Sequence, residues 1–165
     1  MNIVQTAKAL SHEERLDRLS NVAVNVGLQL KRGQELVMTA PIEALPLVRR
    51  ITAHAYKAGA SLVTTLFSDD ETTLQRFQFG DDAGFDHASG WLYDGMAAAF
   101  RSGAARLAIA GDNPSLLSGQ DSEKVARANR ARSQAYKPAL ELIVGFDINW
   151  SIVSYATEAW AKTVF

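Results

Sequence analysis

The chain has 165 residues, of which 47% are hydrophobic, and a formal net charge of -1 at pH 7. This length suffices for one self-supporting core, and the balanced charge argues against a general polyanion binder, which needs a basic excess. The absence of cysteine excludes disulfides, thiolate catalysis and cysteine-ligated zinc. Neither the first ten residues nor any later run has the pattern of a secretion signal or a membrane span, so we expect a soluble, cytoplasmic chain with no membrane partner.

The amino-terminal part begins with a helix signal. Ser11 and Glu14 have the spacing of a capping box, in which two side chains satisfy N–H groups at the start of a helix. We expect the helix that follows to end at Gly27, since glycine is a common helix terminator. A short apolar strand is expected over 35–40, closed by Pro41.

The middle of the chain predicts a second helix from about Glu43 to a terminating Gly59, and a second strand over 61–67. That strand is rich in β-branched residues and almost continuously apolar, a pattern typical of parallel strands that are covered on both faces. A short helix is expected to open at 69–71 and to give way to an irregular loop over 80–89.

The last part repeats the same alternation. We expect a helix over 91–100, a strand over 106–110 and, after Asp121 or Ser122, a long helix to about residue 142 that Pro138 kinks or splits. The final residues, 149–165, predict a buried strand and a helix that is unfinished where the sequence stops.

This alternation of helix and strand with short connections predicts one α/β domain over residues 1–165, a small three-layer sandwich around a parallel sheet with right-handed crossovers. The topology is expected to be Rossmann-like, but the nucleotide fingerprint is missing, because residues 39–44 after the first strand include no glycine. A Walker A loop and a Gly-x-Ser-x-Gly elbow are also absent from the sequence.

The richest group of metal-type ligands lies in the loop before the third helix: Asp81, Asp82, Asp86 and His87. Carboxylates with an imidazole suit a divalent cation. The alternative is an acidic surface loop in which Asp86 or Ser89 caps the helix at Trp91, and we favour it because the spacing matches no EF-hand. His12 and His54 stand alone, with no metal-ligand spacing.

The long helix carries a basic face formed by Lys124, Arg127 and Arg130. This face is the only feature that argues for nucleic acid or phosphate. The alternative is an ordinary solvated helix that starts acidic and ends basic, with Glu123 and Arg127 as an i,i+4 ion pair. The balanced charge of the chain favours this second interpretation, without nucleic acid.

The turn 111–114, Gly-Asp-Asn-Pro, is the best local candidate for a binding role. It lies between the carboxyl end of a predicted strand and the amino end of predicted helical residues, where ligands collect in open α/β sheets. The alternative is helix capping, for which Asp, Asn and Pro are also suited. From the residues alone, no self-contained catalytic constellation emerges.

A series of segments, taken in order, resembles the amino-terminal domain of one family, the thermophilic-type metallo-aminopeptidases: 26–34, 40–47, 55–60, 68–71, 111–117, 125–127, 130–131, 150–157 and 160–162. The resemblance spans nearly the whole chain and rests on the ordered series more than on any one motif. One departure is Tyr155-Ala156-Thr157, where the family pattern leads us to expect Tyr-Pro-Thr.

The resemblance implies a two-domain, usually homodimeric enzyme that removes amino-terminal residues from peptides with two divalent metal ions, zinc, cobalt or manganese. In that family the metal ligands lie in a carboxyl-terminal catalytic domain, and none of those positions exists in this chain. No catalytic or metal-binding residue is therefore assigned here. We expect the chain to shape the substrate cavity and to be inactive alone.

Four residues are candidates for contacts with the substrate cavity: Asp112, Asn113, Tyr155 and Thr157. Their alternative role is capping and packing at the edge of the core. The alternative function for the whole chain is a free-standing α/β ligand-binding or interaction module without catalysis, in which the turn 111–114 forms the pocket.

Overall fold

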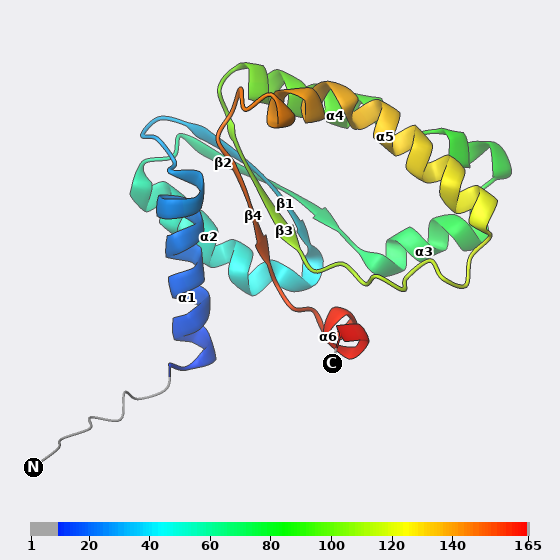
Figure 1. The fold of residues 1–165 in the computed structure, drawn as a ribbon, viewed down its shortest axis with the longest axis horizontal. Helices are drawn as coiled ribbons and strands as arrows, with labels where there is room; N and C mark the ends of the chain where they lie inside the picture. Colours follow the sequence, from blue (N-terminus) through cyan, green and yellow to red (C-terminus); the bar gives the residue numbers. More distant parts are fainter. Residues whose placement is uncertain (1–9, 165) are drawn as a thin grey trace, which may run out of the picture.

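The structure, a computed structural model, describes residues 10–164. Its sheet has four parallel strands in the order β2-β1-β3-β4 (Figure 1). Their bounds are β1 Glu35–Pro41, β2 Leu62–Ser68, β3 Ala105–Ala110 and β4 Trp150–Ser154. The expectations for residues 1–9 and for Phe165 concern residues outside the described range.

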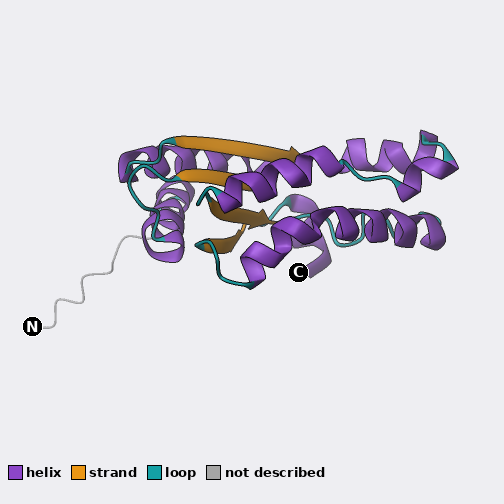
Figure 2. Cartoon of the chain, turned by 90° about the horizontal axis from the view of Figure 1, so that it is seen from above, coloured by secondary structure: helices purple, strands orange, loops and turns teal. Residues whose placement is uncertain are grey.

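Helices cover both faces of this sheet, which confirms the predicted three-layer α/β sandwich. One face packs against α1 (His12–Val22) and α2 (Leu45–Ala58), and the other against α4 (Gly90–Arg101) and α5 (Ser122–Val144). Side chains alternate between the faces along a strand, so Leu36 belongs to the first core and Val37 to the second. Helices α4 and α5 lie side by side and extend beyond the strands (Figure 2).

The start of α1 is as the sequence predicts, but its end is different. The Ser11 hydroxyl accepts from the Glu14 N–H, and the Glu14 carboxylate accepts from the Ser11 N–H, which confirms the capping box. The predicted stop at Gly27 is wrong, because the helix continues as a wider π-helical segment, Ala23–Leu28, and ends at Gln29 in the left-handed conformation. Gly27 instead allows close contact with Ser151 of β4.

The prediction that the second strand is covered on both faces is also wrong. Strand β2 lies at an edge of the sheet, and Leu62 and Phe67 are 48% and 43% exposed. The following helix, α3 (Asp70–Phe79), lies beyond the carboxyl end of β2 and not over its face (Figure 1). An apolar run therefore gave no information on whether the strand was central or at the edge.

The remaining connections are short. A 3-10 turn, Ile42–Ala44, leads from β1 into α2, and a second 3-10 segment, Asp82–Asp86, precedes α4. Helix α2 ends at Gly59, with φ 98°, as predicted. The last helix is α6, Glu158–Val164. No helix within residues 10–164 is long and apolar enough to cross a membrane.

The segment between β3 and α5 departs from the sequence prediction. Residues 114–120 form turns and no helix, and the Asn113 side chain accepts from the Ser115 N–H at 3.0 Å. Helix α5 begins after Asp121, whose carboxylate accepts from two N–H groups, so the predicted cap is confirmed. The helix runs unbroken through Pro138 and is not split there.

Candidate functional site

The carboxyl ends of the four strands meet at one edge of the sheet, which we call the carboxyl edge. It comprises the polar residues that follow each strand: Glu43 after β1, Asp70 after β2, Asp112 and Asn113 after β3, and Tyr155 and Thr157 after β4. The connection from β1 leads to one side of the sheet and that from β3 to the other. The edge thus contains the switch point at which open α/β sheets bind ligands.

A cavity of about 570 Å³ lies at this edge. Its lining comes from the segments that follow the four strands and from α6: Glu43, Asp70, Asn113, Ser115, Thr157, Glu158, Ala159, Lys162 and Thr163. Two of the four candidates, Asn113 and Thr157, line it, whereas Asp112 and Tyr155 do not. Glu43 and Asp70 were missed by the sequence analysis, although each follows closely on a predicted strand and parallel pairing brings such residues together.

Thr157 and Tyr155 hold the ends of β3 and β4 together. The Thr157 side chain, in a residue only 7% exposed, donates to the Gly111 carbonyl at 2.6 Å and accepts from the Trp160 N–H at 3.2 Å. The Tyr155 N–H donates to the Ala110 carbonyl at 2.7 Å. For Thr157, the capping role considered from the sequence is therefore present in the structure.

The carboxyl edge is acidic. Asp70 is the residue most affected: partial burial raises its pKa, and the charges of Glu43 and Asp112 raise the pKa further. The Asp112 carboxylate accepts from the Ser68 hydroxyl at 3.4 Å. Because carboxylates gathered at a partly buried edge attract positive charge, the cavity is suited to a cationic group such as an ammonium.

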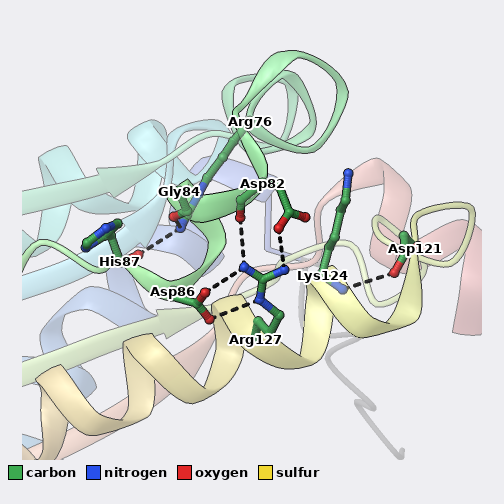
Figure 3. A network of polar contacts seen from close by, with 8 residues as sticks. All are labelled: Arg76, Asp82, Gly84, Asp86, His87, Asp121, Lys124 and Arg127. Atoms are coloured by element: carbon green, nitrogen blue, oxygen red, sulfur yellow. Dashed lines mark hydrogen bonds and ion pairs between the residues drawn. The ribbon is translucent and has the colours of Figure 1, made fainter.

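Acidic residues of the loop before α4 are bound by α5. The Arg127 guanidinium donates to the Asp82 carboxylate at 2.9 Å and to the Asp86 carboxylate at 2.6 and 3.0 Å (Figure 3). Arg76 donates to the carbonyls of Gly84 and His87 at 2.8 Å. This network supports the interpretation of an acidic surface loop.

Two details of the sequence analysis are corrected by this network. Arg127 binds the loop, so its predicted pairing with Glu123 is wrong and its charge is already neutralised by carboxylates. Asp86 caps no helix, and Ser89 precedes α4 without a side-chain capping bond. The predictions for Arg127 and Asp86 fail for one reason. These two residues, 41 positions apart, bind each other in place of the local contacts that the sequence suggested.

The chain from residue 12 to residue 165 matches the model of a family described as thermophilic metalloprotease (M29). The chain belongs to this family. The family resemblance seen in the sequence is thereby confirmed.

Two relatives and one solved structure show how much of such a protein the chain represents. It is 48% identical to aminopeptidase T of Thermus thermophilus over 93% of this chain and 38% of the relative. It is 35% identical to aminopeptidase 2 of Geobacillus stearothermophilus, over 93% of this chain and 37% of that relative. The solved structure of wild-type AmpT from Thermus thermophilus superposes with a TM-score of 0.91 at 48% identity, over 94% of this chain and 39% of that one. The chain thus spans less than two fifths of these relatives.

A metalloprotease family implies a metal cofactor, and the described residues do not fit one. Within residues 10–164, no group of three or more His, Cys, Asp and Glu side chains is arranged to hold a metal ion. His54, for example, lies in α2 and contacts Asp17 of α1 at 2.9 Å. No catalytic step is therefore assigned to this chain.

Proposed function

We propose that this chain is the amino-terminal domain of a metal-dependent aminopeptidase, the enzyme class that removes amino-terminal residues from peptides. The observation that carries the proposal is the alignment of over 90% of the chain with proteins named aminopeptidases, of which it covers less than two fifths. The same match is seen in three dimensions, with a TM-score of 0.91. Hydrolysis then belongs to a further, carboxyl-terminal domain, which holds two divalent ions such as zinc, cobalt or manganese.

In this proposal the carboxyl edge borders the substrate cavity. The amino end of a peptide is a protonated ammonium group, and the carboxylates of Glu43, Asp70 and Asp112 create a negative potential that favours its approach. Asn113 adds a side-chain amide on the cavity wall, next to the α6 residues that close it. The domain thus selects and orients peptides, and it is inactive alone. We further propose that the complete enzyme is cytoplasmic and homodimeric.

The test uses a chimaera in which this chain replaces the matching segment of Thermus thermophilus aminopeptidase T. Replacing Glu43 by Gln or Asp70 by Asn in the chimaera is expected to raise KM for peptides about twofold to fivefold, since each change removes a charge worth up to about 1 kcal/mol at a partly exposed site. The turnover number should change less, because neither side chain is part of the reaction centre.

The matched control is Lys137→Gln, which removes a charge from the exposed face of α5, where Lys137 is paired only loosely with Glu141 at 3.9 Å. Its KM should equal that of the parent chimaera. Equal KM values for all three variants would contradict a role of the carboxyl edge in substrate capture. Amino acid release by the 165-residue chain alone, with added zinc, cobalt or manganese, would contradict its inactivity.

A further inference from the structure

A second pocket, of about 430 Å³, lies between the sheet and the α4–α5 pair. We call it the arginine pocket, and it is lined from β1, β2, β3, α4 and α5 by Thr39, Ala40, Leu66, Phe67, Ser68, Leu92, Tyr93, Met96, Arg106, Arg132, Ser133 and Tyr136. It shares no lining residue with the cavity of the carboxyl edge. Its volume lies in the range of small-molecule sites.

Arg106 is the most unusual residue of this pocket. It lies in the central strand β3, and its neighbours Ala105 and Leu107 belong to the core on the α1–α2 face, so Arg106 faces the α4–α5 side. Its Nε is buried and has no hydrogen-bond partner among the described residues. A buried N–H group of a charged side chain that lacks an acceptor destabilises the folded chain. An acceptor supplied by a ligand would remove this cost.

The rest of the lining matches an anion with an apolar body. Arg132 adds a second guanidinium, and neither arginine forms an ion pair with any residue between 10 and 164. None of the described residues in the lining is Asp or Glu, whereas Thr39, Tyr93 and Ser133 are among those that bring hydroxyl groups. Apolar side chains such as Leu66, Leu92 and Met96 form much of the remaining wall. A guanidinium fork matches the two oxygens of a carboxylate.

We propose that the arginine pocket binds the carboxylate of a short peptide or of an amino acid with an apolar side chain. Arg106 holds the carboxylate, and Arg132, exposed on α5, is the second cationic contact. Ser68 connects this site with the carboxyl edge, since it lines the pocket and its hydroxyl donates to Asp112. A basic pocket that is linked in this way to an acidic edge suits a molecule with an ammonium at one end and a carboxylate at the other. Naming peptides as the ligand class rests on the proposed function, whereas the carboxylate site itself does not.

The test is a nuclear magnetic resonance titration of the 15N-labelled 165-residue chain, observed at the Nε–Hε signal of Arg106. The probe is N-acetyl-leucine, which carries a carboxylate and an apolar side chain but no ammonium group. Its matched control is N-acetyl-leucinamide, which differs in the lack of the carboxylate. We expect a saturable shift of the Arg106 signal with the acid and none with the amide. No saturable shift with the acid, or equal shifts with both, would overturn the proposal.

Two variants and a second anion complete the test. Arg106→Met keeps the length of the side chain without its charge and should weaken binding of N-acetyl-leucine, followed at the amide signals of Thr39 and Ser133, at least about tenfold. Arg106→Lys should restore part of the affinity. Inorganic phosphate should bind more weakly than N-acetyl-leucine, because it cannot contact the apolar wall, and tighter phosphate binding would overturn the carboxylate assignment. The readout needs no peptidase activity, so a negative result here leaves the proposed domain role standing. In the same way, failure of the proposed domain role leaves the carboxylate site standing.

Discussion

At the end of β3, the backbone of Gly111 lies against the carbonyl group of Tyr155, so that an added Cβ would collide with that carbonyl oxygen. Because the obstacle is backbone that is fixed by the Tyr155–Ala110 hydrogen bond, it cannot move aside cheaply. We expect Gly111→Ala to lower the free energy of unfolding by at least about 1–3 kcal/mol, measured by urea denaturation.

Gly95 offers the matched control for this substitution. It lies in α4, and a Cβ added there meets nothing within 4 Å. Gly95→Ala should raise the stability by up to about 1 kcal/mol, since alanine favours the helix. Equal effects of the two substitutions would show that β3 and β4 are not held together as described.

Gly27 provides a second close approach, but against a side chain. A Cβ at this position would lie 2.9 Å from Ser151 Oγ and 3.5 Å from Ser151 Cβ. Gly27→Ala alone should therefore destabilise by roughly 1 kcal/mol, and the double variant with Ser151→Ala should recover most of the loss, since only an ordinary contact remains. Additive costs in the double-mutant cycle, followed by thermal unfolding, would contradict this packing of the π-helical segment on β4.

Asp70 tests the acidic character of the carboxyl edge. Its pKa is raised first by burial and then by the charges of Glu43 and Asp112, so the carboxyl group protonates at a higher pH than an ordinary aspartate. A carboxyl-carbon titration by nuclear magnetic resonance should show this, and Glu43→Gln should lower the Asp70 pKa more than Asp112→Asn does. An Asp70 pKa at or below the ordinary value would contradict the described clustering.

Among the elements, α5 and the segment Asp82–Asp86 form a unit through Arg127. The hydrogen bonds from Arg127 hold the pKa of Asp86 below its usual range. Arg127→Met should raise the Asp86 pKa toward the ordinary value and speed hydrogen exchange of the segment 82–86. Lys137→Gln, on the same helix, should do neither, and an unchanged Asp86 pKa in Arg127→Met would contradict the network.

The pH dependence of this unit follows from the direction of the shift. A carboxyl group whose pKa is lower in the folded than in the unfolded chain contributes stability above its unfolded pKa, and that contribution is lost as the pH falls through its folded pKa. Loosening of the segment 82–86 on acidification should therefore occur below the ordinary aspartate range, and in Arg127→Met this acid-dependent part should disappear.

Local signals explain which elements the sequence could predict. The capping box at Ser11, the terminator Gly59 and the cap Asp121 act within a few residues of their helix ends, and all three are confirmed. The exposure of β2 depends on which strands flank it, and the partner of Arg127 depends on a loop 41 residues away. Such long-range pairings leave no periodic trace in the sequence.

For the whole molecule, parallel pairing explains how much of the candidate site could be foreseen. Alternation of helices and strands predicted a shared carboxyl edge, and Asn113 and Thr157 do line its cavity. Lys162 was not foreseen, because its place depends on how α6 continues after β4. The arginine pocket was missed as well, since Arg106 looks like the polar start of a strand until its Nε is seen buried.

The most direct measurement is the aminopeptidase activity of the chimaera with Thermus thermophilus aminopeptidase T, compared with that of the same enzyme lacking its first domain. Both are assayed by leucine release from a dipeptide with added cobalt. The account predicts that the chimaera releases leucine at a rate within about tenfold of the intact relative, while the truncated enzyme does not. A well-folded chimaera that is no more active than the truncated enzyme would contradict the assignment of this chain as an aminopeptidase domain.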